Sequence, residues 1–148
     1  MKRARIPGAR YFGRMLKRVD HIGIVVDDLE SGRRFLEGLG FQLAQDVAVP
    51  ERGIHVSFWR CGEVAIELIQ MDEPEANRER LRGETQARIE HIAFEVDDLD
   101  ATIEDVKARG LELTGPPSHL AALGTTSVWT KPETSDGYQL QLFSRQRA

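Results

Sequence analysis

The sequence has a single cysteine, Cys61, and no apolar run that approaches the length of a membrane-spanning helix. One cysteine excludes an internal disulfide and suits a reducing compartment. A helix that crosses a bilayer needs about 20 consecutive apolar residues, so we expect no membrane partner. The chain is otherwise ordinary for a globular domain, with 41% apolar and 30% charged residues among 148.

Acidic residues are missing from the first 18 positions, which carry seven lysines and arginines. The rest of the chain therefore holds 13 basic and 24 acidic side chains, behind an overall net charge of −4. Such an acidic body argues against nucleic acid as a partner. We expect residues 1–16 to be a basic, poorly ordered leader and the protein to be cytoplasmic. If the arginine-rich leader is instead a transit peptide, the mitochondrial matrix is expected.

An internal repeat dominates the rest of the sequence. Residues 20–29 read DHIGIVVDDL and residues 90–99 read EHIAFEVDDL, with six identical positions at a spacing of 70 residues. In both copies the Asp-Asp pair precedes apolar residues at helical spacing, and a glycine (Gly40 or Gly110) follows. Acidic caps and closing glycines mark the two ends of a helix. The repeat therefore predicts a duplicated strand–helix–strand unit.

Each copy continues into further strands, which alternate apolar and polar residues between turn-forming segments. In the first copy, strands are expected at 41–49, 54–60 and 63–70. In the second copy, a flexible stretch runs from 115 to 124, and strands are expected at 111–113, 125–130 and 138–143.

The pattern predicts one α+β domain over residues 17–144. It consists of two βαβββ modules at 17–70 and 89–144, joined by a polar linker at 71–88 in which residues 75–81 form a short helix. Two such curved sheets side by side would enclose a ligand-binding cleft.

Strand alternation places the repeated histidines on the concave face. His21 and His91 point away from the apolar side chains of their strands, which must cover the helices. A small residue stands two positions further on in both copies, Gly23 and Ala93, and this predicts room for a bound group.

The last strand of each module adds one oxygen donor to the same face. Alternation directs Glu67 and Gln141 to the concave side, at nearly equivalent positions of the two copies. Two imidazoles, a carboxylate and an amide oxygen suit a divalent cobalt, nickel, manganese or zinc ion. The two other histidines, His55 and His119, have no repeat partner and are expected at the surface or in loops. The predicted metal ligands are His21, Glu67, His91 and Gln141.

The sequence resembles the vicinal oxygen chelate superfamily, and within it the methylmalonyl-CoA epimerases, over about residues 17–144. The resemblance rests on segments such as DHIGIVVDDLESGRRFLEGLGF, RIEHIAFEVDDL and KPETSDGYQLQL. It implies an eight-stranded cupped sheet, commonly in a homodimer, and metal ligands at the same four positions. It also implies a catalytic glutamate at Glu51, in the turn before Gly53; from the residues alone, Glu51 reads as a solvated turn residue.

The chemistry implied by the resemblance is proton abstraction next to a carbonyl that chelates the metal, with the metal stabilising the enolate. The chain departs from the epimerases at Gln141, where the typical enzyme has a glutamate that is both ligand and second acid/base. A glutamine binds metal through its oxygen but accepts no proton at neutral pH. Glu51 would then act as a one-sided base.

This departure keeps other functions open. One alternative is another metal-dependent isomerase or lyase of the superfamily, such as a lactoylglutathione lyase-like enzyme. A second is a non-catalytic small-molecule or drug-binding protein of the bleomycin-resistance type. The substrate is expected to be a small molecule such as an acyl-CoA, for which the linker offers basic contacts; the alternative reading of the linker is a solvated charged helix. Trp59 and Trp129 occupy equivalent strands, in the core or in the cleft wall. The linker arginines are Arg78, Arg80, Arg82 and Arg88.

Overall fold

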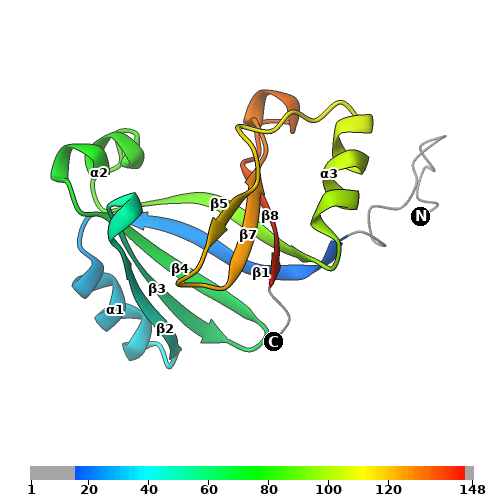
Figure 1. Ribbon diagram of the computed structural model, residues 1–148. Helices are drawn as coiled ribbons and strands as arrows, with labels where there is room; N and C mark the ends of the chain where they lie inside the picture. Colours follow the sequence, from blue (N-terminus) through cyan, green and yellow to red (C-terminus); the bar gives the residue numbers. More distant parts are fainter. Residues whose placement is uncertain (1–15, 146–148) are drawn as a thin grey trace, which may run out of the picture.

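The computed structural model describes residues 16–145, so residues 1–15 of the expected leader and their targeting role lie outside the described residues, whereas Leu16, expected in the leader, begins the first strand. The first module runs through one helix and four strands (Figure 1). The second module also has one helix and four strands, and it follows a short connecting helix, α2 (Pro74–Leu81). The first module comprises β1 (Leu16–Val26), α1 (Leu29–Gly38), β2 (Gln42–Val49), β3 (Ile54–Cys61) and β4 (Val64–Met71). The second comprises β5 (Ala87–Val96), α3 (Leu99–Ala108), β6 (Ser118–Leu120), β7 (Thr125–Trp129) and β8 (Leu140–Arg145).

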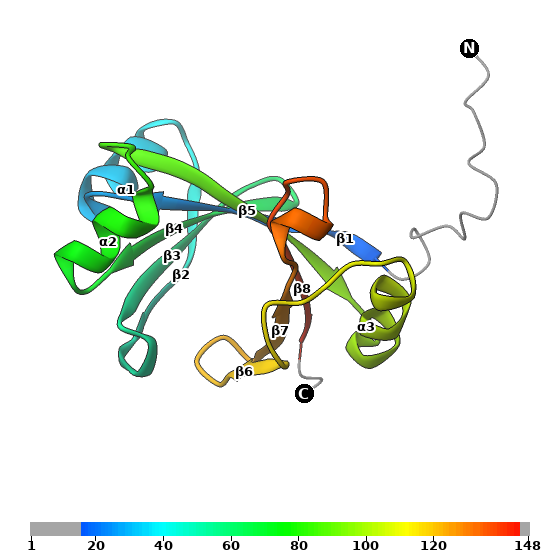
Figure 2. The ribbon, with the colours of Figure 1, turned by 90° about the horizontal axis from the view of Figure 1, so that it is seen from above.

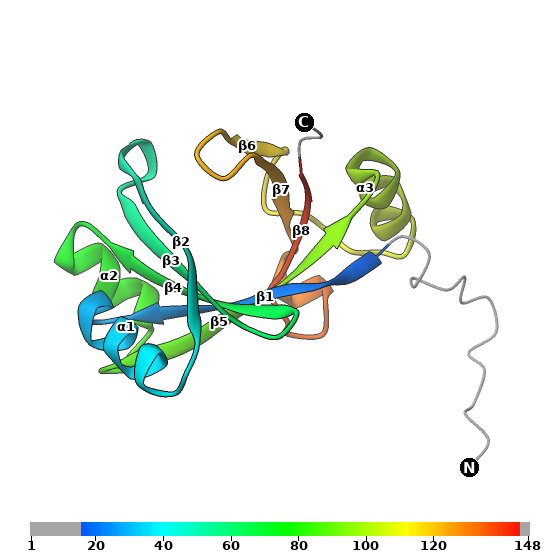
Figure 3. The ribbon, with the colours of Figure 1, turned by 90° about the horizontal axis from the view of Figure 1, so that it is seen from below.

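The eight strands form one sheet in the order β2-β3-β4-β1-β5-β8-β7-β6. The first strands of the two modules pair antiparallel at its centre, and each also pairs in parallel with the last strand of its own module. The sheet curls, so that its outer strands, β2–β3 and β6–β7, project in the same direction (Figures 2 and 3). The α+β fold of paired βαβββ modules expected from the repeat is confirmed.

The helices begin where the repeated aspartates predict. Asp28 accepts hydrogen bonds from the backbone amides of Glu30 and Ser31, and Asp98 accepts one from Ala101. These contacts satisfy amides that lack partners inside the first helical turn. Across residues 16–145, no helix is long and apolar enough to span a membrane.

Each module has its own apolar core between its helix and its half of the sheet, as expected when amphipathic helices cover one face of a sheet. In the first module, Trp59 is 5% exposed and packs with residues of α1 and β4, so it belongs to the core. The first cluster contains Val26, Leu29, Leu36, Trp59 and Leu68. The second contains Val96, Leu99, Ile103, Val106, Val128 and Leu142.

Two strand predictions in the second module are wrong. Residues 111–113 contribute only an isolated bridge, between Leu113 and Thr130, and the strand forms instead at Ser118–Leu120, within the stretch expected to be flexible. Pro116 and Pro117 lack amide protons, so pairing resumes only after them, as a hairpin with β7. The last strand starts at Leu140 rather than Tyr138, because Gly137 turns the chain with φ +84° and leaves Tyr138 61% exposed.

Candidate metal centre

Two small residues at the middle of the sheet organise the site. Gly23 on β1 lies in register with Glu67 on one neighbouring strand and with His91 on the other. Ala93 on β5 lies in register with His21 and with Gln141 in the equivalent way. All four predicted ligand positions therefore lie at the centre of the sheet. The first module supplies His21 and Glu67, and the second module supplies His91 and Gln141.

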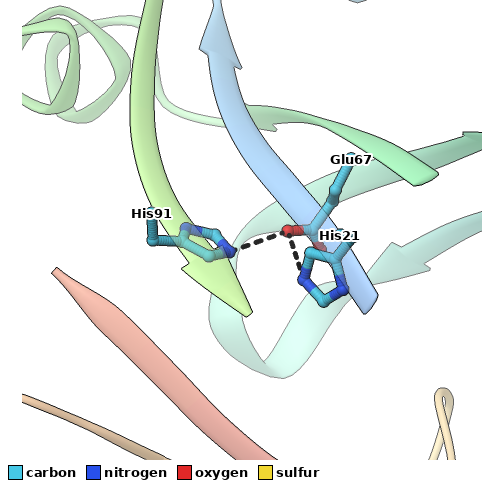
Figure 4. A group of neighbouring side chains, drawn as sticks. All are labelled: His21, Glu67 and His91. Atoms are coloured by element: carbon cyan, nitrogen blue, oxygen red, sulfur yellow. Dashed lines mark ion pairs between the residues drawn. The ribbon is translucent and has the colours of Figure 1, made fainter. Parts of the chain in front are cut away.

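Three of the four side chains converge closely (Figure 4). Nε2 of His21 lies 3.5 Å and Nε2 of His91 lies 3.3 Å from the same Glu67 carboxylate oxygen, Oε1. The ligand atoms of these three residues lie within 4.8 Å of one another, and all three residues are buried. The geometry provides a nitrogen–oxygen cluster of a size that a divalent ion could bridge.

The fourth side chain, Gln141, faces the same cavity as Glu67 and His91. Its amide nitrogen donates a hydrogen bond of 2.9 Å to Oγ of Ser127. Its Oε1 is buried and finds no hydrogen-bond partner among the described residues, and the same holds for Nε2 of His21 and of His91. Leaving a buried polar atom unpaired costs about 1–3 kcal/mol, so three together in one place indicate a missing partner. Lone pairs on two imidazoles and an amide oxygen would be satisfied by a cation, and the donor set fits a divalent metal.

Each histidine of the pair is held by the acidic residue directly before it. Nδ1 of His21 lies 2.8 Å from Asp20, and Nδ1 of His91 lies 3.1 Å from Glu90. An ionised carboxylate only accepts hydrogen bonds, so Nδ1 carries the proton and the lone pair lies on Nε2, which points into the site. Metal-binding histidines commonly have this outer carboxylate.

Arginines keep both carboxylates ionised. Burial opposes the charge of Asp20, but the hydrogen bond with His21 and the charge of Arg145 outweigh it and lower the pKa of Asp20 to about 2. Burial likewise opposes the charge of Glu90, yet hydrogen bonds from Arg80 and His91 lower its pKa to about 2. Both acceptors are therefore charged at neutral pH.

The pKa of His91 responds to the same neighbours. Burial lowers it, but the negative charges of the nearby Glu67 and Glu90 carboxylates outweigh burial, so the pKa is raised above its ordinary value. In the metal-free protein a proton therefore competes for the position that a metal would take, because only neutral imidazole binds a metal.

Gly23 makes room for a protein side chain, not for a ligand, which corrects the expectation from sequence. A Cβ atom at this position would lie 2.0 Å from Cε1 of His91. The space above Gly23 is thus filled by the His91 ring, and only glycine allows the two central strands to bring that ring over the sheet.

A cavity of about 280 Å³ opens beside the cluster, between the two modules. Trp129 lines it and packs edge-on against His91, with ring centroids 4.7 Å apart, so this tryptophan belongs to the cleft wall. The wall from the first module presents four apolar side chains, Ile54, Val56, Ile69 and Met71, together with Arg52 and Glu67. The wall from the second module carries hydroxyl and amide groups, from Ser118, Thr125, Ser127 and Gln141.

The structure does not bring Glu51 into this cavity. Glu51 is exposed on a 3-10 turn (Pro50–Arg52), and its neighbour Arg52 lines the cavity instead, contacting Ser118 of the opposite module. The direction of a side chain on such a turn depends on tertiary packing, which strand alternation does not predict.

The linker arginines separate into different environments. Arg80 lines the cavity, whereas Arg82 and Arg88 line another hollow and Arg78 pairs with Glu75 in solvent. The two unrepeated histidines lie outside the cluster: His55 is bonded to Asp46 and His119 to Thr126.

Some residues of the site were missed by reasoning from sequence. The carboxylates of Asp20 and Glu90 precede both histidines, and their recurrence in the repeat was an available signal. Ser127 and the contact of Arg80 with Glu90 had no such signal, because they depend on how β7 and α2 pack.

A curled sheet of paired βαβββ modules with a histidine–carboxylate cluster at its centre defines the class of protein. The chain belongs to the glyoxalase/bleomycin resistance protein/dioxygenase superfamily, which matches residues 20–128.

Among particular relatives, the human mitochondrial methylmalonyl-CoA epimerase is 29% identical over 131 residues, covering 86% of this chain and 73% of that protein. The crystal structure of methylmalonyl-CoA epimerase from Mycobacterium tuberculosis superposes with a TM-score of 0.79 at 20% identity, over 90% of this chain and 91% of that one. A Streptomyces coelicolor methylmalonyl-CoA epimerase variant in complex with 2-nitronate-propionyl-CoA also has a TM-score of 0.79, at 22% identity, over 89% and 99%. At these identities the structural matches show the fold, and the human relative indicates an epimerase-like member of the superfamily.

Proposed function

We propose that the protein is a metal-dependent enzyme that removes the proton next to the thioester carbonyl of an acyl-CoA, as a methylmalonyl-CoA epimerase does. The observation that carries the proposal is a set of three buried ligand atoms that find no hydrogen-bond partner within residues 16–145. Those of His21 and His91 converge on the Glu67 carboxylate, and that of Gln141 belongs to the same cavity. The epimerase relatives, one of which was solved with an acyl-CoA analogue, support the substrate class.

His21, Glu67, His91 and Gln141 would hold the metal. When bound, a divalent ion supplies a Lewis acid for two substrate oxygens and for the negative charge that develops during proton removal. The protein's own contribution is to fix the ligands: Asp20 and Glu90 orient the two imidazoles through Nδ1.

The cavity walls orient the substrate. The apolar side chains of the first module offer a surface for a small alkyl branch, and the opposite wall offers hydroxyl and amide groups for polar oxygens.

Glu51 is the proposed base. It is exposed on the turn beside the cavity, and Gly53, with φ +61°, forms the end of that turn. To reach the reacting carbon, the turn must move inward when substrate binds; Arg52, which already lines the cavity, lies on the same turn. The proposal therefore includes a substrate-dependent rearrangement of residues 50–53.

A specific observation favours a second candidate, a one-base isomerase or lyase of the same superfamily. Gln141 accepts no proton, and Glu67 is the only carboxylate among the described residues that line the cavity. Inversion of a carbon needs acid/base groups on both faces, whereas proton transfer on one face needs a single base. The ligand set argues against a purely drug-binding role. Binding of an apolar drug would leave the buried ligand atoms of His21, His91 and Gln141 without a partner among the described residues.

Hydrogen–deuterium exchange at the α-carbon of methylmalonyl-CoA tests the proposal. Cobalt-loaded protein is incubated with substrate in D₂O, and both epimers are followed by mass spectrometry and chiral analysis. Exchange with inversion supports the epimerase, and exchange without inversion supports the one-base candidate. Absence of exchange, with metal bound stoichiometrically, would overturn the epimerase proposal and direct the second candidate to substrates other than methylmalonyl-CoA.

The homodimer implied by the resemblance is retained as a proposal. Phe35 on α1 and Leu39, directly after this helix, are 67% and 62% exposed, and Leu43 on β2 is 52% exposed. Light scattering coupled to size exclusion tests it, and a monomer at micromolar concentration would contradict it.

A further inference from the structure

The guanidinium of Arg80 lies at the edge of the cavity that holds Glu67 and His91. It reaches the cavity from α2, the helix that connects the modules. Its Nε and Nη2 donate to the two carboxylate oxygens of Glu90 at 2.6 and 2.7 Å. This bidentate contact fixes the plane and the direction of the guanidinium.

The other edge of the guanidinium has donors to spare. Among the described residues, Nη1 contacts only the thioether sulfur of Met71, at 3.3 Å, and a thioether is a weak acceptor. A guanidinium has five N–H groups, of which Glu90 engages two. The bidentate contact with Glu90 holds the remaining donors near the cavity, and no oxygen atom of residues 16–145 accepts from them.

The charges that line the cavity are mostly positive. Arg52 and Arg80 are the cationic side chains among its described lining residues, and Glu67 is the one carboxylate. This balance stands out in a protein with a net charge of −4. A concave site whose charge opposes that of the surrounding protein concentrates anionic ligands.

Resting on the proposed function, we propose that Arg80 selects the substrate by binding a negatively charged carboxylate on the acyl group. In an acyl-CoA of the malonyl type, this carboxylate sits on the carbon next to the thioester carbonyl. A planar guanidinium edge matches the two oxygens of a carboxylate, and the clamp by Glu90 removes the entropic cost of ordering the side chain. Thioesters that carry the carboxylate therefore bind more tightly than thioesters that lack it.

The competing role for Arg80 is purely structural: it would only keep Glu90 in place behind His91. The two roles separate in a pair of variants. Glu90→Gln keeps an acceptor for His91 and keeps the charge of Arg80, while Arg80→Gln combined with Glu90→Gln removes the ion pair. In both variants Arg88, which lies 3.7 Å from Glu90, keeps its hydrogen bond to the backbone carbonyl of residue 80. Arg78→Gln, on the same helix and in solvent, is the matched surface control.

The measurement is calorimetric binding of methylmalonyl-CoA and of isobutyryl-CoA, in which a methyl group replaces the carboxylate. Each protein is titrated both metal-free and loaded with cobalt. We expect wild type and Arg78→Gln to prefer methylmalonyl-CoA in both states, and Glu90→Gln gives the baseline with which the double variant is compared. The double variant should lose about 10- to 100-fold of this preference in both states, with isobutyryl-CoA affinity unchanged within about twofold.

An unchanged preference in the double variant would overturn the assignment of Arg80. So would a loss confined to the cobalt-loaded protein, because that result would place the effect on the metal ligands. Equal binding of both thioesters by the wild-type protein would also overturn the assignment of Arg80. The proposed reaction would then still be tested by the exchange experiment. Failure of both esters to bind would overturn the proposed acyl-CoA substrate together with this inference.

Discussion

Substitution of Gly23 by alanine tests the site at its most crowded point. The added Cβ would lie 2.0 Å from Cε1 of His91 and 2.4 Å from both of its ring nitrogens. Ordinary van der Waals contact begins at 3.4 Å, so the ring must retreat by at least about 1.4 Å. The ring has little freedom to do so, because its side chain is 1% exposed, bonded to Glu90 and packed against Trp129.

The expected result is loss of His91 from the ligand cluster. A displaced outer partner of a metal ligand already costs 10- to 100-fold in affinity, so displacement of a ligand itself should weaken cobalt binding by about 100-fold or more. Overpacking should also lower the free energy of unfolding of the metal-free protein by about 1–3 kcal/mol. Calorimetric titration with cobalt and urea unfolding in chelator measure the two effects separately.

Gly38→Ala is the matched control, because a Cβ at this position in α1 meets nothing within 4 Å. Helix propensity predicts that this variant is as stable as wild type or slightly more so, with unchanged cobalt affinity. If Gly23→Ala bound cobalt with wild-type affinity, the placement of His91 over Gly23 and the proposed ligand set would both be refuted.

Three further predictions concern the ligands and the carboxylates behind them. Gln141→Glu adds a second anionic ligand and should tighten cobalt binding by about 10-fold or more in calorimetry; weaker binding would contradict ligation at this position. Asp20→Asn should weaken cobalt binding 10- to 100-fold, whereas an unchanged Kd would show that the carboxylate does not support His21. The pKa values of Asp20 and Glu90 are lowered to about 2, from 3.8 and 4.5. Their stabilising contributions, about 2 and 3 kcal/mol, are therefore fully present above about pH 5 and are lost as the pH falls towards 2. The difference in urea unfolding free energy between wild type and Asp20→Asn should shrink by about 2 kcal/mol between pH 6 and pH 2, and a constant difference would refute the shift.

Much of the fold could be predicted because the repeat carries it. Two matching strand–helix units, with aspartates at the helix starts and alternation of period two, restrict the chain to paired modules. The same alternation predicted that His21, Glu67, His91 and Gln141 share the concave face, since the side-chain direction within a strand follows from its periodicity alone.

The predictions from sequence fail where the direction of a side chain depends on contacts between secondary-structure elements. Tyr138 fits the alternation of the last strand, yet the turn at Gly137 keeps it outside the sheet. Trp59 and Trp129 are equivalent in sequence, but one is buried beneath α1 and the other lines the cavity beside His91. The small side chain of Gly23 predicted an opening, whereas its role is set by a ring from the other module.

The duplication also explains why the charge of the site is unbalanced. Each module contributes one histidine and one oxygen donor, but the donor is a carboxylate in the first module and a neutral amide in the second. A bound dication would therefore be neutralised only halfway by Glu67, because the charge of Arg80 at the same cavity is already paired with Glu90. A substrate that brings its own carboxylate supplies the missing negative charge, which an enzyme with two ligand carboxylates would not need to the same extent. A neutral amide at Gln141, which cannot act as an acid or base, thus also favours an anionic substrate. Gln141→Glu should weaken the preference for methylmalonyl-CoA over isobutyryl-CoA, although it increases the affinity for the metal.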